Sequence, residues 1–164
     1  MKTTVLNQHQ IQQKINRIAY EILENNYESE KLFLIGIKGN GCELAKQLSE
    51  ILGKISDQEI IQAQISIDKH HPLDHEIELS IATEEIENQT IILIDDVINS
   101  GRTMQYALVK LLERPTDRIK TVALVDRKHR KFPIRVDYVG LTLSTTLQDR
   151  IEVDFGDNST AYLT

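Results

Sequence analysis

Cysteine is almost absent from the sequence, and its scarcity limits the chemistry of the chain. Cys42 is the only cysteine among 164 residues, which excludes an internal disulfide and a cysteine-rich zinc site. Long apolar runs are also missing, because no stretch approaches the roughly 18–20 residues that a membrane span needs. The N-terminal segment MKTTVLNQHQ lacks the apolar core of a signal peptide. We therefore expect a cytoplasmic protein with no membrane partner.

Positive charge is in short supply as well. The chain has 19 Lys and Arg residues against 25 Asp and Glu residues, which gives a net charge of −6. This balance argues weakly against nucleic acid as the main partner, because non-specific affinity comes from cations that neutralise phosphates. The cations of the one basic run, RKHRKFPIR, are Arg127, Lys128, Arg130, Lys131 and Arg135. Apart from Arg127, we interpret them as a solvated basic face, with RNA binding as the alternative.

The patterning that is present predicts one α/β domain over residues 1–164. Helical spacing of apolar residues predicts helices in residues 8–25, 39–53 and 103–113. Aliphatic runs without alternation predict buried parallel strands in residues 31–38, 90–96 and 121–126, with later strands in 134–143 and 150–155. Residues 59–67 and 77–81 alternate around the turn DKHHPLDH and predict an antiparallel hairpin or flap. The expected fold is a mainly parallel central sheet flanked by helices, with a small antiparallel flap.

The segment IILIDDVINSGRTM, residues 91–104, combines an apolar strand with two adjacent acids and a polar turn. Burying carboxylates is costly, so Asp95 and Asp96 at the end of this strand are expected to bind something. Ligands of open α/β sheets lie beyond the carboxyl ends of the strands. The turn gathers main-chain amides, the hydroxyls of Ser100 and Thr103, and a helix N-terminus, which suit a phosphate monoester. A sugar phosphate fits both features, since ribose hydroxyls can donate to the carboxylates.

Two common nucleotide-binding loops do not fit the sequence. Gly36 and Gly41 have the spacing of a P-loop, but Cys42 and Glu43 stand where that loop needs Lys and Ser or Thr. No G-x-G-x-x-G follows a predicted strand, so a dinucleotide-binding fold is also disfavoured.

The segment 91–104 closely resembles the phosphoribosyl diphosphate (PRPP) signature of type I phosphoribosyltransferases. LIGIKGNGCELAKQL, residues 34–48, resembles the diphosphate-binding loop and helix of the same family. LVDRKHRKFPIRVDYVG, residues 124–140, closely resembles the bacterial pyrimidine operon attenuation regulators that also act as uracil phosphoribosyltransferases. Together with INRIAYEILE near the N-terminus, the resemblance covers most of residues 8–140.

The resemblance implies a magnesium-dependent enzyme that transfers ribose phosphate from PRPP to a nucleobase, with uracil favoured, and that forms a homodimer or a higher homo-oligomer. Asp95 and Asp96 would bind the ribose hydroxyls and stabilise the oxocarbenium-like carbon. The implied PRPP-binding residues are Lys38, Gly39, Asp95, Asp96, Val97, Asn99, Ser100, Gly101, Arg102 and Thr103. The implied base-binding residues are Asp126, Arg127, Val139 and Gly140. Mg²⁺ would be held mainly through PRPP, without a full protein cage.

The chain departs from its relatives in two places. The regulators usually have Lys-Thr-Arg-Gly in the diphosphate loop, whereas this chain has Lys38, Gly39, Asn40 and Gly41, so one arginine is missing. The flap is reduced to residues 68–75, although closure over the reaction excludes water. Both departures favour one alternative, an RNA-binding attenuation regulator with weak or no catalysis. A purine phosphoribosyltransferase that uses hypoxanthine or guanine is the other alternative.

The flap turn is also rich in histidine. Its His70, His71, Asp74 and His75 have side chains that suit zinc, but we interpret them as a solvated polar turn.

Overall fold

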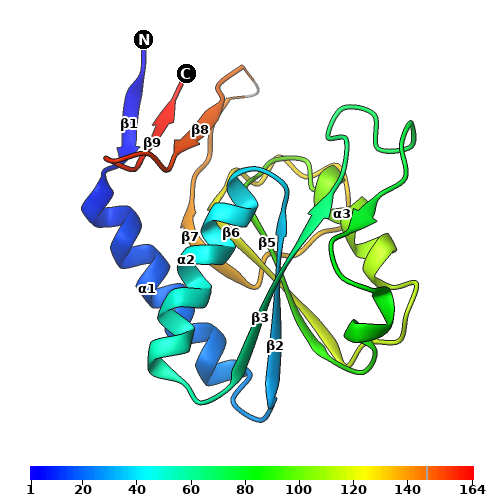
Figure 1. Ribbon diagram of the computed structural model, residues 1–164. Coiled ribbons are helices and arrows are strands. Elements are labelled where there is room, and N and C mark those ends of the chain that lie inside the picture. Colours follow the sequence, from blue (N-terminus) through cyan, green and yellow to red (C-terminus); the bar gives the residue numbers. More distant parts are fainter. Residues whose placement is uncertain (147) are drawn as a thin grey trace.

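A six-stranded sheet forms the centre of the protein (Figure 1). The computed structural model describes residues 1–146 and 148–164. The strands lie in the order β4-β3-β2-β5-β6-β7, and all pairs are parallel except that of β4 with β3. The bounds are β2 Lys31–Ile37, β3 Glu59–Ser66, β4 Glu78–Leu79, β5 Thr90–Ile98, β6 Arg118–Asp126 and β7 Tyr138–Thr142. The predicted fold class, a mainly parallel sheet flanked by helices, is confirmed.

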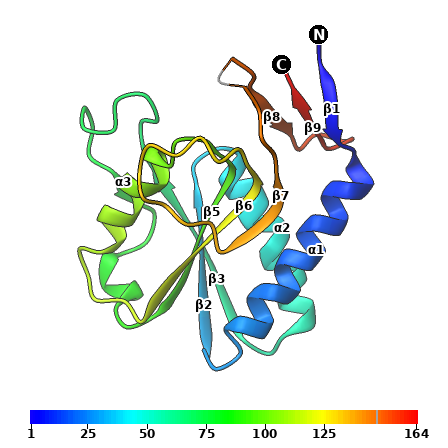
Figure 2. The same cartoon turned by 180° about the vertical axis from the view of Figure 1, so that it is seen from behind.

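Helices cover both faces of this sheet (Figures 1 and 2). The helices α1 (Gln8–Asn25) and α2 (Asn40–Ile55) lie on one face, and α3 (Arg102–Leu111) with the short 3-10 helix η1 (Thr83–Ile86) lies on the other. Neighbouring residues of β2 enter different cores: Leu34 joins the core under α1 and α2, and Ile35 joins the core under α3. A strand that is buried on both faces needs apolar residues at every position, which explains its unbroken aliphatic run.

The helix α1 follows directly from its sequence pattern. Its apolar stripe, which consists of Ile11, Ile15, Ile18, Ala19 and Ile22, is buried. A capping box begins the helix, because Asn7 accepts from the main-chain N–H of Gln10 at 2.9 Å and the Gln10 side chain accepts from the N–H of Asn7 at 2.9 Å. No helix of the described residues is long and apolar enough to cross a membrane.

A second, three-stranded antiparallel sheet joins the two ends of the chain (Figure 1). Its order is β1-β9-β8, with β1 at Thr3–Leu6, β9 at Thr160–Leu163 and β8 at Ile151–Asp154. The pairing of Thr3 with Leu163 places β1 beside β9. This sheet lies near the carboxyl end of β5, where β8 contacts β5. Only β8 was predicted from the sequence.

Three predicted elements differ from the structure. Residues 59–67 were predicted as one arm of an antiparallel hairpin, but β3 is a parallel strand of the central sheet, and only its last two residues pair with β4. The helix α2 does not stop at Gly53 but continues to Ile55. The strand predicted over 134–143 is confined to β7, because Asp137 instead uses its side chain to accept from the N–H of Thr121 in β6.

Candidate active site

The two adjacent acids lie at the carboxyl end of β5 and point to opposite faces of the strand, as consecutive strand residues do. Asp95 lines a cavity of about 330 Å³ together with the polar turn that follows the strand. Asp96 lines a second cavity of about 320 Å³ together with residues of β8. Lys69, Val97 and Asn99 line both cavities. The end of β5 therefore separates two adjoining cavities, and each acid of the pair lines one of them.

Asp95 is a buried carboxylate, with 2% of its surface exposed. Its Oδ1 accepts from the N–H of Asp96 at 2.9 Å, and Nζ of Lys69 lies 3.6 Å from its Oδ2. Burial, reinforced by the negative charge of Asp96, raises the pKa of Asp95 to about 7, although Lys69 acts in the opposite direction. Asp95 is thus poised to gain hydrogen-bond donors or positive charge from a ligand.

Asp96 is held in place by two donors. Its Oδ1 accepts from the N–H of Val97 at 2.7 Å, and its Oδ2 accepts from Nδ2 of Asn40 at 3.0 Å. The same amide nitrogen of Asn40 donates to the carbonyl of Val153 at 2.8 Å. Asn40 therefore connects the N-terminus of α2, the acidic pair and the small sheet.

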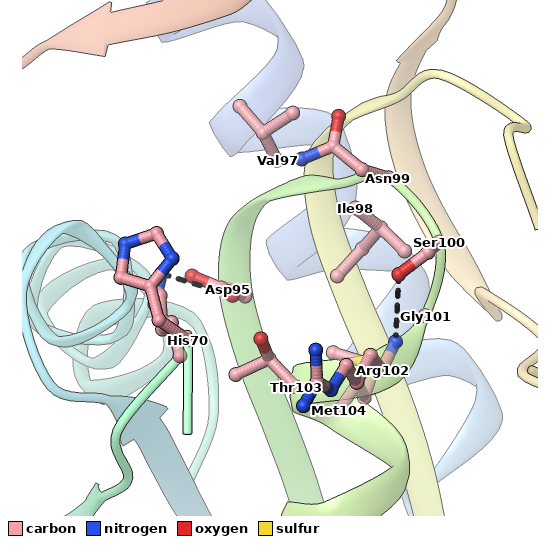
Figure 3. Close-up of a pocket in the computed structure, with 11 residues that line it drawn as sticks. His70, Asp95, Val97, Ile98, Asn99, Ser100, Gly101, Arg102, Thr103 and Met104 are labelled. Carbon is pink, nitrogen blue, oxygen red and sulfur yellow. Dashed lines mark hydrogen bonds and ion pairs between the residues drawn. The ribbon is translucent and has the colours of Figure 1, made fainter. Parts of the chain in front are cut away.

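The polar turn after β5 leads directly into α3 (Figure 3). Gly101 precedes the helix with φ of 85°, a left-handed conformation that glycine adopts without strain. A Cβ at this position would also lie 3.1 Å from Ile134. Ser100 accepts from the N–H of Arg102 at 3.3 Å, and Thr103 lines the cavity one residue further on. The helix N-terminus thus faces the cavity that contains Asp95, an arrangement suited to an anion.

The loop after β2 reaches the same end of the sheet, because β2 and β5 are paired. Gly39 has φ of 105°, which only glycine adopts readily. Gly41 allows α2 to approach β5, since a Cβ on Gly41 would lie 2.7 Å from the carbonyl oxygen of Ile94. The side chain of Lys38 is exposed, and neither Lys38 nor Gly39 is among the residues that line the two cavities. The structure therefore brings the loop near the acids through Asn40.

Arg127 holds the polar turn in place through a hydrogen bond to Asn99. Its guanidinium donates to the side chain of Asn99 at 2.8 Å, to the hydroxyl of Thr145 at 2.9 Å and to the carbonyl of Thr146 at 3.0 Å. The side chain of Arg127 is thereby tied to the turn and to the segment after β7. The guanidinium would therefore have to contact the base, as predicted, while it also makes these hydrogen bonds.

Arg130 contradicts the interpretation of the basic run as solvated outside Arg127. Its guanidinium lies 2.9 Å from Oδ2 of Asp126 and donates to the carbonyls of Asn99 and Ile134 at 2.9 and 3.1 Å. A buried carboxylate at the end of β6 needs a partner, and Arg130 provides it. The side chains of Lys128, Lys131 and Arg135 are exposed.

The structure places Val139 and Gly140 apart from the two cavities. Both belong to β7, and neither is among the residues that line either space. Arg17 of α1 donates to their carbonyls at 3.2 and 2.8 Å. Their contact with a base remains a prediction.

Sequence reasoning missed Lys69 and the strand β8 as parts of the site. Lys69 lies in the flap turn, where no pattern distinguishes it from a solvated lysine. Ile151, Glu152 and Val153 line the second cavity, but they belong to the C-terminal segment, which resembles the family least. Among the described residues, no three His, Cys, Asp or Glu side chains come together as a metal-binding group.

Comparison with known proteins extends these observations to most of the chain. Residues 1–160 match the family model of the phosphoribosyl transferase domain. A protein of Limosilactobacillus reuteri subsp. reuteri named bifunctional protein PyrR is 37% identical over 163 residues, covering 93% of this chain and 91% of the relative. Its namesake from Bacillus mycoides is 36% identical over 166 residues, covering 93% and 90%.

A solved structure has the same fold. The hypoxanthine phosphoribosyltransferase of Trypanosoma cruzi superposes with a TM-score of 0.78 at 17% identity, covering 97% of this chain and 95% of that one. The sequence matches and the arrangement of the acidic pair around the polar turn agree, and the chain belongs to the phosphoribosyltransferase family.

Proposed function

We propose that this protein transfers the 5-phosphoribosyl group of PRPP to a nucleobase, with uracil as the preferred base. The observation that carries the proposal is the cavity of about 330 Å³, in which the buried Asp95 faces the N-terminus of α3. The helix N-terminus and the turn suit the 5-phosphate, and a carboxylate next to them suits the ribose hydroxyls.

The transfer needs little covalent chemistry from the protein. The bond between C1 of the ribose and the diphosphate breaks, and its electron pair leaves with the diphosphate. The ring nitrogen of the base then bonds to C1 and releases its proton to solvent. Asp95 and Asp96 each line one of the two cavities, where their negative charge would favour the positive charge that develops on the ribose ring. The turn from Asn99 to Thr103 holds the phosphate and thereby orients C1.

Magnesium fits the residues that are present. Mg²⁺ prefers oxygen ligands and is usually bound through one or two carboxylates together with substrate phosphates. Asp95 and Asp96 offer carboxylate oxygens at the cavities, and PRPP would provide the remaining ligands. When bound, the ion would offset the negative charge of the leaving diphosphate.

The choice of base rests on the sequence rather than on the cavity. Residues 124–140 resemble regulators that also act as uracil phosphoribosyltransferases, and the names of the two relatives call them bifunctional. Asp126, Arg127, Val139 and Gly140 are the proposed base-binding residues. A purine base is the alternative within the same reaction. We also propose one domain over residues 1–164 and a homodimer, and the homodimer rests on resemblance alone.

RNA binding is a second candidate function. The exposed side chains of Lys128, Lys131 and Arg135 favour it, because their cationic groups face solvent, with Arg135 also 3.4 Å from Asp137. Such a surface can neutralise phosphates in addition to, or in place of, catalysis.

The test of the proposal is release of diphosphate from PRPP with uracil, hypoxanthine and guanine in parallel. We expect release with uracil, and its loss when Asp95→Asn and Asp96→Asn are combined. Circular dichroism should show that the double variant remains folded, because the like charges of the pair do not help the ligand-free protein. Wild-type turnover in this variant would contradict the proposal, and release with purines alone would assign the alternative base.

A further inference from the structure

Asn40 uses both N–H bonds of its side-chain amide on acceptors from two distant parts of the chain. Its Nδ2 donates to Oδ2 of Asp96 in β5 at 3.0 Å and to the carbonyl of Val153 in β8 at 2.8 Å. An amide nitrogen has two N–H bonds, so both are occupied. Turning the amide over would set its oxygen against a carboxylate and a carbonyl, which repel it. These two partners therefore fix the orientation of the amide.

The carboxylate of Asp96 is oriented by its hydrogen bonds without being saturated. Its Oδ1 accepts from the main-chain N–H of Val97 at 2.7 Å, and its Oδ2 accepts from Asn40. A carboxylate has about four acceptor sites, so roughly two remain for a ligand. Because the amide of Asn40 carries no charge, it directs the carboxylate and leaves its negative charge available to the ribose ring.

The small sheet takes part through the carbonyl of Val153. The side chains of Ile151 and Val153 are buried in the core under α1 and α2, so β8 is anchored by packing. Asn40, Asp96 and Val153 all line the second cavity. The C-terminal segment thereby sets the direction of a side chain in the diphosphate loop, and this side chain sets the direction of the carboxylate.

We propose that Asn40 is a positioning residue, which holds the carboxylate of Asp96 in the orientation that accepts from the ribose hydroxyls and is itself held by Val153. The inference rests on the proposed function and adds a residue that acts through another. Asn40 has no free donor for the sugar, because both of its N–H bonds are occupied. Its loss frees the carboxylate to rotate, and a misplaced group in a site costs binding and rate.

The test separates the sugar hydroxyls from the phosphate. Calorimetry in one magnesium buffer measures the binding of ribose 5-phosphate and of propyl phosphate, a phosphate monoester without sugar hydroxyls. The wild type should prefer ribose 5-phosphate, because its hydroxyls donate to the acidic pair. In Asn40→Ala we expect ribose 5-phosphate to bind about 10-fold more weakly and propyl phosphate to stay within about twofold of the wild-type affinity. Gln47→Ala, which removes an amide that bonds to Glu43 on the same helix, is the matched control and should change neither.

A second variant, Asn40→Asp, keeps the shape of the side chain. Aspartate is favourable in the first turn of a helix, where residue 40 lies, but its carboxylate cannot donate. It should weaken ribose 5-phosphate at least as much as Asn40→Ala does and leave propyl phosphate within about twofold of the wild type. Circular dichroism checks the fold of both variants. Wild-type affinity for ribose 5-phosphate in either folded variant would overturn the positioning role.

A comparison of double variants shows whether Asn40 acts through Asp96. In the Asp96→Asn background, the carboxylate that Asn40 positions is gone. Adding Asn40→Ala should then change the affinity for ribose 5-phosphate by less than about twofold. A further loss of about 10-fold in that background would mean that Asn40 acts by another route, and it would contradict the inference.

The outcomes also separate the inference from the function on which it rests. If the wild type prefers ribose 5-phosphate to propyl phosphate and Asn40→Ala keeps this preference, the role of Asn40 is wrong and the proposed function stands. If Asn40→Ala weakens both ligands equally, Asn40 supports the site as a whole, and the positioning role is wrong. A wild type that binds neither ligand, or both equally, would overturn both proposals, since the acidic pair would then serve no sugar.

Discussion

The buried carboxylate of Asp95 lowers the stability of the ligand-free protein, although the proposed function needs it. The pKa of Asp95 is raised to about 7 because the protein removes the side chain from water and places Asp96 beside it. In an unfolded chain, the same group would titrate near 3.8. The folded protein thus binds a proton that the unfolded chain has already released between these pH values. Such strain is typical of sites whose ligand provides the missing partner.

The first prediction concerns the pH dependence of stability. Because the folded pKa of Asp95 is raised, the free energy of unfolding should fall as the pH rises from about 4 to about 7. Asp95→Asn has no such titration and keeps the acceptor for the N–H of Asp96. The variant should therefore exceed the wild type in stability at pH 7.5, by up to ~4 kcal/mol, and the difference should vanish below pH 4. Urea denaturation across this range measures the effect, and parallel curves for the two proteins would contradict it.

At the scale of single residues, the sequence revealed the groups that belong to a contiguous motif. Asp95, Asp96 and the turn could be predicted because they follow one another after a buried strand. Lys69 could not, because its contact with Asp95 arises only when the segment after β3 meets the end of β5. Arg130 was misjudged although its partner Asp126 lies only four residues before it, because nothing in a basic run shows which cation turns back to the strand end. A solvated lysine and a lysine that lies over an active site look the same in a sequence.

At the scale of elements, the polar turn acts as one anion-binding unit. Ser100 and Thr103 lie on either side of the helix start, and Arg127 fixes the turn from behind through Asn99. Because the unit is proposed to hold the 5-phosphate, its loss should affect every ligand that has this group.

The second prediction follows from this unit. Ser100→Ala combined with Thr103→Ala should weaken PRPP and ribose 5-phosphate alike, each lost charge-assisted hydrogen bond costing on the order of 1.5–3 kcal/mol. Diphosphate alone should bind as in the wild type. Calorimetry with the three ligands gives the answer. Unchanged affinity for ribose 5-phosphate would mean that the turn holds no phosphate.

The third prediction compares two glycines of α2. Gly41→Ala forces a Cβ to within 2.7 Å of the carbonyl oxygen of Ile94, so α2 must move away from β5. We expect a loss of about 1–3 kcal/mol in unfolding free energy and a lower kcat/KM, since Asn40 moves with the helix. Gly53→Ala is the matched control: it has no neighbour within 4 Å and should gain about 0.5–1 kcal/mol from helix propensity. Denaturation and rate measurements on both variants check this contrast, and equal effects would refute the close-approach argument.

The elements that the sequence misjudged or missed have two physical causes. The alternation in β3 suggested antiparallel pairing. It arises instead because this strand lies beside the short β4 and only part of it is buried. The strands β1 and β9 are four residues each and pair across almost the whole chain. Short strands have too few residues to show a period, and long-range pairing leaves no local signal.

At the scale of the whole molecule, a net charge of −6 must be weighed against a local basic surface. The structure removes Arg127 and Arg130 from that surface by tying them to Asn99 and Asp126. Lys128, Lys131 and Arg135 remain exposed. Lys128 has a φ of 58°, and its main-chain N–H donates to the side chain of Asp126. The main chain at this position is therefore fixed by a hydrogen bond, whereas the side chain is exposed.

The last prediction separates an RNA regulator from an enzyme. If the exposed cations bind a structured leader RNA, affinity should fall steeply with salt, with a log–log slope of about −0.9 per phosphate neutralised. Lys128→Glu combined with Lys131→Glu would then abolish RNA binding. The main-chain N–H of Lys131 donates to the carbonyl of Ser100, a bond that survives the substitution, so PRPP binding should be spared.

We expect instead that RNA binds weakly, because three exposed cations on an acidic protein offer only a few phosphate contacts. The wild type should retain RNA weakly and without preference for sequence, and base transfer should be nearly unchanged in the double charge reversal. Filter binding at physiological salt and the diphosphate release assay provide the two measurements. Tight, leader-specific binding that this variant loses would reverse our order of preference, and the exposed cations would then mark the main functional surface of the protein.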